Sequence, residues 1–368
     1  MNDHLDSIIC LRPFYSLELH IKGDVSVCCP AWSKGMVGNL HKKSLLEIWN
    51  DAPLQKMRRM MLEGKWEKVC RPTCPVIMNY RATGERTRLA GEHQYVITEE
   101  ILSAVRSRQT VLTTGPTWIN LANSTICNLN CIMCGREYYK ESARLSQKTI
   151  TEVKALLPGL REIFLAGNGD PFARPDTREL MLSLDSSLCP DLRFDLLTNG
   201  LLLPRYWDRI RHLNLGGLNI SVDAATPQTY EIVRRGGRWR DLVCAFELVR
   251  DNRDRFSQII INMTVMRENY REIPAFVELA ARYGFAAGIS KIRGKWANQN
   301  IFTSGEPGIS HELRDTIMRA RQRAGELGVP FYYAEFNDIL AGETVTFARR
   351  NKQRIIDTLV QVYHTLKP

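Results

Sequence analysis

Residues 125–135 read Thr-Ile-Cys-Asn-Leu-Asn-Cys-Ile-Met-Cys-Gly (TICNLNCIMCG) and place Cys127, Cys131 and Cys134 on one short loop. Three thiolates in this Cys-x3-Cys-x2-Cys spacing match three irons of a [4Fe–4S] cluster, which takes four thiolates when fully ligated. No fourth cysteine lies nearby, so one iron would stay open to an external ligand. Structural zinc is the alternative, but zinc prefers four ligands in paired Cys-x2–4-Cys units.

Length and composition are those of a globular protein. The chain has 368 residues, with 44% hydrophobic and 24% charged residues, which is ample for two or three domains. It contains no apolar run long enough to cross a membrane, and Asp3 and Asp6 interrupt any signal-peptide pattern. We therefore expect a cytoplasmic protein without a membrane partner. In that reducing compartment clustered cysteines bind metal more often than they form disulfides.

The net charge of +10 includes no run of five basic residues. A diffuse positive charge is compatible with a small anionic ligand, but it gives little support to nucleic-acid binding.

Short apolar strands alternate with helical stretches on both sides of the cysteine loop. We expect strands at residues 117–122, 162–166, 193–197, 218–222, 259–265 and 287–292. We expect helices at residues 148–157, 176–186, 203–212, 227–250 and 271–283. This alternation predicts βαβ units and a parallel sheet, whose functional residues lie at the carboxyl ends of the strands.

The cysteine loop and these strands resemble the radical SAM superfamily over about residues 115–295. The resemblance implies an α/β fold, a partial (β/α)6 TIM-like barrel, whose open iron binds the amino and carboxylate groups of S-adenosylmethionine. An electron passed to the sulfonium would release methionine and a 5′-deoxyadenosyl radical. The protein would position that radical against one C–H bond and exclude water. The implied partners are a small-molecule substrate and an electron donor of the flavodoxin or ferredoxin type.

Two segments match the family's cofactor-binding positions near the cluster. Met133 stands where the family often has an aromatic residue, and it would cover adenine by apolar contact. Residues 167–171 (GNGDP) resemble a Gly-Gly-Glu-Pro segment whose backbone binds the methionyl amine, which makes Gly167, Asn168, Gly169 and Asp170 candidates. Turn composition alone is the alternative explanation of this segment.

Further candidates for binding the cofactor come from strand ends: Thr198, Ser221, Asp223, Arg235 and Asn262. Ser221 and Asp223 would face the ribose or the carboxylate, although capping of the next helix is an alternative role. Arg235 resembles an arginine that pairs with the cofactor carboxylate, for which a planar guanidinium is well suited. A solvated charge at a helix end is the alternative for Arg235.

The N-terminal cysteines form a second group, made of Cys10, Cys28, Cys70 and Cys74. Residues 15–21 and 25–28 predict a β-hairpin that turns at residues 22–24, and residues 45–49 predict a short helix. This pattern resembles the twitch or SPASM module, which holds one auxiliary [4Fe–4S] cluster on four such cysteines. In the family the module follows the barrel, whereas here it precedes it. A zinc ribbon is the competing interpretation.

We divide the chain into an auxiliary iron–sulfur module (1–80), a linker (81–114), the barrel (115–295) and a C-terminal helical extension (296–368). The extension has amphipathic patterns at residues 311–327 and 347–366. The neighbour of Cys28, Cys29, is spare: it either replaces Cys28 as a ligand or returns a hydrogen atom to a substrate radical.

The resemblance implies hydrogen abstraction from a small polyhydroxylated substrate: a sugar, an aminocyclitol or a nucleotide conjugate. Epimerisation would use a thiol such as Cys29, and oxidation would use the auxiliary cluster as an electron acceptor. The alternatives are a peptide or protein maturase, an RNA-modifying enzyme and a non-enzymatic iron–sulfur protein. The sequence names neither the substrate, the product nor the oligomeric state.

Overall fold

One sheet organises the whole molecule. The computed structural model describes residues 8–84, 94–134, 143–165, 168–293, 298–303 and 308–340. Ten strands lie in the order β10-β9-β8-β7-β6-β5-β4-β1-β2-β3. Their bounds are β1 Ser16–His20, β2 Asp24–Ser26, β3 Gly38–Asn39, β4 Trp118–Ala122, β5 Glu162–Leu165, β6 Arg193–Thr198, β7 Leu215–Ser221, β8 Gln258–Val265, β9 Ala286–Lys291 and β10 Phe331–Tyr332.

The six expected barrel strands are confirmed as β4 to β9, and each pairs in parallel with the next. Their side chains alternate between two environments, as strand geometry requires. In β8, Ile261 and Met263 are fully buried, while Asn262 and Thr264 on the other face are only partly buried. The apolar face packs beneath the helices, and the polar face lines the concave side of the sheet.

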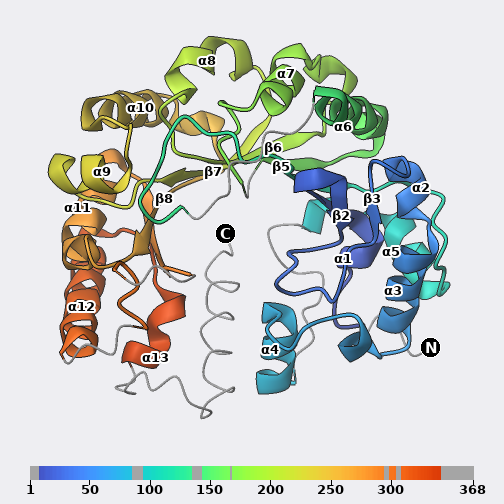
Figure 1. Ribbon diagram of the computed structural model, residues 1–368, viewed down its shortest axis with the longest axis horizontal. Helices are drawn as coiled ribbons and strands as arrows, with labels where there is room; N and C mark the ends of the chain where they lie inside the picture. Colours follow the sequence, from blue (N-terminus) through green and yellow to red (C-terminus); the bar gives the residue numbers. More distant parts are fainter. Residues whose placement is uncertain are drawn as a thin grey trace.

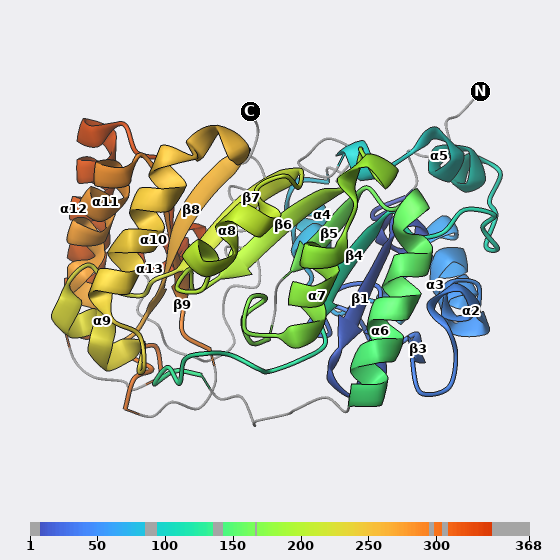
Figure 2. The same ribbon diagram turned by 90° about the horizontal axis from the view of Figure 1, so that it is seen from above.

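Helices cover the outer side of this curved sheet, as Figures 1 and 2 show. Those in the barrel are α6 Ala143–Leu156, α7 Pro175–Ser183, α8 Leu203–Ile210, α9 Pro227–Val233, α10 Trp239–Asp251 and α11 Ile273–Tyr283. The remaining helices are α1 Arg12–Tyr15, α2 Leu45–Trp49, α3 Ala52–Leu62, α4 Pro75–Thr83, α5 Glu99–Arg106, α12 Ile309–Leu327 and α13 Asn337–Leu340. In Figure 1 the molecule is an arch, with α11–α13 in one leg and α1–α5 in the other.

The helix predicted over residues 227–250 is two helices, α9 and α10. Gly236, between them, has a φ of +92°. This left-handed conformation suits glycine and cannot continue an α-helix. The break turns the chain back toward the cysteine loop, where the backbone N–H of Asn130 donates to the carbonyl of Arg235 at 2.9 Å.

The predicted N-terminal hairpin is confirmed as β1 and β2, which pair antiparallel. Lys22 and Gly23 form its turn with φ values of +62° and +76°. Strand β1 also pairs in parallel with β4, from Ser16 opposite Trp118 to His20 opposite Ala122. The N-terminal segment therefore supplies a strand to the barrel sheet and shares its hydrophobic core. This continuity was not expected from the division into modules.

The sheet ends at β10 on one side and at β3 on the other, so no pairing of described strands closes the barrel. The segment expected to be a linker, residues 81–114, includes α5. The predicted helix at residues 311–327 is confirmed as α12, whereas the predicted helix at 347–366 and Gly167 lie outside the described residues. Among the helices described here, none is long and apolar enough to cross a bilayer.

Candidate functional site

The cysteine loop leaves the carboxyl end of β4, and its thiols receive hydrogen bonds from neighbouring segments. The backbone N–H of Leu129 lies 3.4 Å from Cys127 Sγ, and Asn199 Nδ2 lies 3.7 Å from the same sulfur. Arg234 Nη1 lies 3.6 Å from Cys131 Sγ. Burial raises the pKa of Cys131, and the N–H donor of Arg234 offsets part of that rise by favouring the thiolate. The loop therefore provides the donor chemistry that an iron–sulfur cluster requires.

The segment after β5 packs against the backbone of this loop at Ile126. Gly169 has a φ of +69°, and a Cβ atom built on it would lie 2.2 Å from the carbonyl oxygen of Ile126. The N–H of Asp170 donates to that oxygen at 2.9 Å. Only glycine permits this close approach. The turn expected around Gly169 is thus a support for the cluster loop.

The buried side chain of Asp170, which follows β5, is hydrogen-bonded to the end of β6. Its carboxylate accepts hydrogen bonds from Thr198 Oγ1 at 2.7 Å and from the N–H of Asn199 at 2.9 Å. The amide of Asn168 donates to the carbonyl of Ala122 at 3.1 Å. In this structure the polar side chains of Asn168, Asp170 and Thr198 hold the ends of β4, β5 and β6 together. Their predicted contacts with the cofactor stay predictions.

A buried ion pair lies on the other side of the loop. Arg234 Nη2 is 2.6 Å from Asp223 Oδ2, and the two side chains are 11% and 1% exposed. Asp223 has a φ of +61°, and its other carboxylate oxygen accepts from the N–H of Thr264 at 2.6 Å. Burial raises the pKa of Asp223, and Arg234 offsets part of that rise. Asp223 thereby positions the guanidinium that contacts Cys131.

Arg234 is the residue that sequence reasoning missed. The side chain of Arg234 reaches Cys131 Sγ, whereas the side chain of Arg235 is exposed. The predicted contact of Arg235 with the cofactor carboxylate stays a prediction. The signal was the Arg-Arg-Gly-Gly motif, which specifies two arginines but not which one faces the loop. That choice depends on where the helix ends, because α9 stops at Val233 and the chain then turns at Gly236.

The other predicted cofactor residues lie around the same edge of the sheet. Ser221 ends β7 and stands opposite Asn262 of β8. The amide of Asn262 donates to the side-chain oxygen of Asn219. Met133 packs against a small apolar cluster that contains Val233, Met266 and Ile292. These positions agree with a ligand bound over the carboxyl ends of the strands.

The four N-terminal cysteines influence one another electrostatically, although they come from separate segments. Burial, followed by the charge of Cys74, raises the pKa of Cys10 to about 11. Burial, followed by Cys10 and Cys74, raises the pKa of Cys70 to about 12. Burial also raises the pKa of Cys28, which is affected by Cys10 and Cys74 as well. This set makes a candidate four-thiolate site, and the charge of Cys29 also acts on Cys74.

Within the described part of the chain, no three His, Cys, Asp or Glu side chains lie close enough to hold a single metal ion. The fit to iron–sulfur clusters therefore rests on donor chemistry. There are two groups of partly buried thiols, and in one of them two sulfurs have N–H donors.

Comparison with known families agrees with both groups of thiols. Residues 124–280 match the radical SAM superfamily, and residues 10–75 match the SPASM iron–sulfur cluster-binding domain. The chain contains a radical SAM domain. Its SPASM domain lies on the N-terminal side of its radical SAM domain. These domains imply a [4Fe–4S] cluster that binds S-adenosylmethionine and an auxiliary iron–sulfur cluster.

Similar proteins include the mitochondrial GTP 3′,8-cyclase of Arabidopsis thaliana, 33% identical over 44% of this chain and 43% of its own length. The AdoMet-dependent heme synthase of Methanosarcina barkeri is 30% identical over 48% of this chain and 50% of its own length. The radical SAM protein thus spans half or less of these two relatives. Among solved structures, SuiB of Streptococcus suis is 12% identical with a TM-score of 0.44, covering 76% of this chain and 64% of that one.

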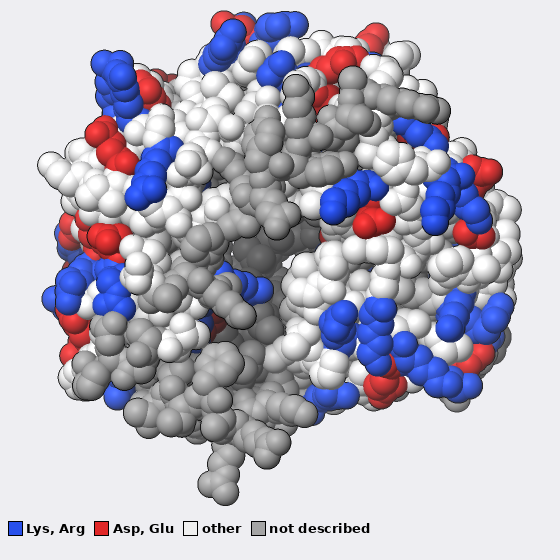
Figure 3. Space-filling model, in the orientation of Figure 1, with Lys and Arg blue, Asp and Glu red and all other residues white. Residues whose placement is uncertain are grey.

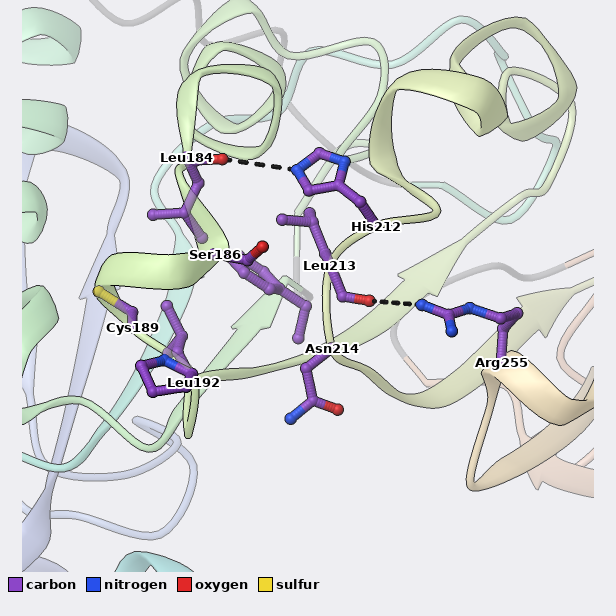
Figure 4. Close-up of a pocket in the computed structure, with 10 residues that line it drawn as sticks. Leu184, Ser186, Cys189, Leu192, His212, Leu213, Asn214 and Arg255 are labelled. Atoms are coloured by element: carbon purple, nitrogen blue, oxygen red, sulfur yellow. Dashed lines mark hydrogen bonds between the residues drawn. The ribbon is translucent and has the colours of Figure 1, made fainter.

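A cavity of about 330 Å³ opens at the opposite end of β6 and β7 in this radical SAM protein. Figure 4 shows His212 and Arg255 at its wall, donating toward the carbonyls of Leu184 and Leu213. The residues that line this cavity lie at or near the amino ends of β6, β7 and β8. Thr198 and Ser221 lie at the opposite, carboxyl ends of β6 and β7. In parallel barrels the amino end serves stability, so the cavity is not part of the candidate site.

Proposed function

We propose that this radical SAM protein abstracts a hydrogen atom from a small polyhydroxylated substrate: a sugar, an aminocyclitol or a nucleotide conjugate. Epimerisation or oxidation of that substrate would follow. The observation that carries the proposal is the shared sheet: β1 pairs with β4, so the SPASM segment and the barrel contribute strands to one continuous concave surface. Polar side chains line that surface, and one relative is named for a reaction of the nucleotide GTP.

In the mechanism that we propose, Cys127, Cys131 and Cys134 hold three irons, and Cys10, Cys28, Cys70 and Cys74 hold the auxiliary cluster. When bound, S-adenosylmethionine and its cluster supply a 5′-deoxyadenosyl radical. Asn199 and Arg234 donate N–H groups to the sulfurs of Cys127 and Cys131. Asp223 keeps Arg234 in place. Arg235, Ser221 and Asn262 stay candidates for direct contact with the cofactor.

Anaerobic incubation of reconstituted protein with S-adenosylmethionine and dithionite tests the class of reaction. We expect 5′-deoxyadenosine from the wild type and none from Cys131→Ala, because that variant loses one of three thiolates. An iron–sulfur protein without enzymatic activity would give none from either. For electron transfer from the proposed flavodoxin- or ferredoxin-type donor, the same assay is run with flavodoxin and its reductase in place of dithionite.

Incubation in D2O distinguishes the two outcomes once a substrate is known. Inversion through a thiol such as Cys29 places solvent deuterium on the product carbon, whereas oxidation does not. Turnover of a peptide in place of a polyol would favour the maturase alternative, and steep salt dependence of RNA affinity would favour RNA modification.

A further inference from the structure

Pairing of β1 with β4 brings Glu18 of the SPASM segment beside Asn120 of the barrel. The two residues are directly opposite in the parallel register. They are 6% and 8% exposed, and the amide of Asn120 hydrogen-bonds the carboxylate of Glu18. Leu17 and Ile119, one position earlier on each strand, belong to the apolar core. Because strand side chains alternate, Glu18 and Asn120 lie on the opposite, concave face of the sheet.

Arg12 joins this pair from α1. Its Nη1 atom lies 3.6 Å from Glu18 Oε1, beyond hydrogen-bonding distance, and its guanidinium lies 5.1 Å from the centre of the Trp118 ring. Trp118 precedes Asn120 by two residues, so it projects from the same face of β4. A cation, a carboxylate, an amide and an indole ring thus meet where the SPASM segment joins the barrel.

Two polar atoms of this group are buried without a hydrogen-bond partner: Asn120 Oδ1, an acceptor, and Arg12 Nη1, a donor. Buried polar atoms are nearly always paired, because an unpaired one loses its hydration without gaining a hydrogen bond. A single group that pairs with both atoms has to donate to the amide oxygen and accept from the guanidinium. A hydroxyl group does both, while a carboxylate or phosphate lacks the donor and an ammonium group lacks the acceptor.

We propose that Arg12, Glu18 and Asn120 form a hydroxyl-binding subsite that anchors a polyol substrate at the junction of the two domains. The subsite rests on the proposed function. It narrows the class of substrate to molecules that the protein recognises through a neutral hydroxyl group. It also assigns a role to the unusual domain order: Arg12 and Glu18 come from the N-terminal segment, and Asn120 comes from β4 of the barrel.

Direct binding tests the subsite without turnover. Anaerobic equilibrium dialysis of the reconstituted protein with S-adenosylmethionine uses three labelled probes: myo-inositol, 2-deoxystreptamine and UDP-glucose. We expect at least one probe to bind, and Asn120→Leu to weaken that binding at least tenfold. Asn214→Leu, at the amino end of β7, is the matched control and should bind as the wild type does. Absence of binding by all three probes, or equal binding by Asn120→Leu, overturns the proposal.

Deoxy analogues of the bound probe give the same test on the wild type, so a folding defect in Asn120→Leu does not matter. Removal of one particular hydroxyl should weaken binding at least tenfold, because it leaves both protein atoms unpaired again. Binding of every analogue within twofold of its parent overturns the subsite. Formation of 5′-deoxyadenosine, measured in parallel, reports on the proposed function separately.

Discussion

Asp223 holds Arg234 against the cluster loop through an ion pair of 2.6 Å, and Arg234 in turn reaches Cys131 Sγ at 3.6 Å. The pair is nearly inaccessible to solvent, so its energetics differ from those of an exposed ion pair such as Arg106–Glu99. Figure 3 shows many further Lys, Arg, Asp and Glu side chains on the surface. A buried charge that loses its partner is strongly destabilising, whereas an exposed pair contributes little.

The Arg-Arg doublet provides the first prediction. We expect Arg234→Lys to lower the rate of 5′-deoxyadenosine formation at least tenfold, because lysine cannot bridge Asp223 and Cys131 with a planar fork. Arg235→Lys, at the exposed neighbour, keeps a positive charge available to the cofactor and should lower the rate less than Arg234→Lys does. Chromatography of quenched anaerobic reactions measures both rates. The reverse ranking would show that Arg235 is the functional arginine.

The second prediction concerns the stability of the ion pair. Asp223→Asn should lower the free energy of unfolding by about 3–5 kcal/mol, because Arg234 would then be a buried and unpaired cation. Adding Arg234→Met should restore part of that loss, since both charges are then gone. Urea denaturation of the metal-free proteins gives these values. The single variant Arg234→Met completes the comparison. If the loss of unfolding free energy in the double variant equals the sum of the losses in the two single variants, the two residues do not act as a pair.

The third prediction compares two glycines with nearly equal backbone angles. Gly169 and Gly84 have φ values of +69° and +71°, but only at Gly169 would a Cβ atom collide with backbone, at 2.2 Å from the Ile126 oxygen. Gly84→Ala should cost about 1 kcal/mol through its left-handed conformation alone. Gly169→Ala should cost more and also lower the iron content, because it displaces the residue before Cys127. Equal iron content in both variants would contradict this.

The fourth prediction identifies the auxiliary ligands. We expect about eight irons per chain in the reconstituted wild type, or four per cluster for two clusters. Cys28→Ser should reduce the count toward about four, because Cys28 is affected by the charges of both Cys10 and Cys74. Cys29→Ser should keep about eight. Colorimetric iron assays with protein quantified by amino-acid analysis decide between the two, and loss of iron only in Cys29→Ser would assign Cys29 instead.

The fifth prediction concerns pH and Asp195, which lies on the concave face of β6 next to Arg193. Burial, followed by the charge of Glu162, raises the pKa of Asp195. Folded Asp195 therefore retains its proton to a higher pH than it does in the unfolded chain. Its stabilising contribution is complete below the unfolded pKa of about 3.9 and is lost as pH rises through the folded pKa.

We accordingly expect the free energy of unfolding of the wild type, relative to Asp195→Asn, to fall as pH rises from about 4 toward 7. Urea midpoints in a series of buffers provide the comparison. A difference that does not change with pH would mean that Asp195 titrates as it does in the unfolded chain.

Much of the candidate site could be predicted from the sequence because its signals are local. The spacing of Cys127, Cys131 and Cys134 determines which thiols share a loop, and alternating apolar patterns located all six strands from β4 to β9. The hairpin turn at Lys22 and Gly23 is likewise a local preference of the backbone. Such features depend on neighbours within a few residues, so a single sequence contains them.

Tertiary structure decided which distant segments meet at the site, because those contacts join residues that are far apart in the sequence. Pairing of Glu18 with Asn120 joins residues 102 positions apart, and no local pattern specifies that β1 adds to the edge of the barrel. The choice of Arg234 over Arg235 depends on where α9 ends against the loop of Cys131. The sequence by itself determined the chemistry of the thiols. Packing of the sheet determined which charged and polar side chains meet beside them, because burial makes those pairings exclusive.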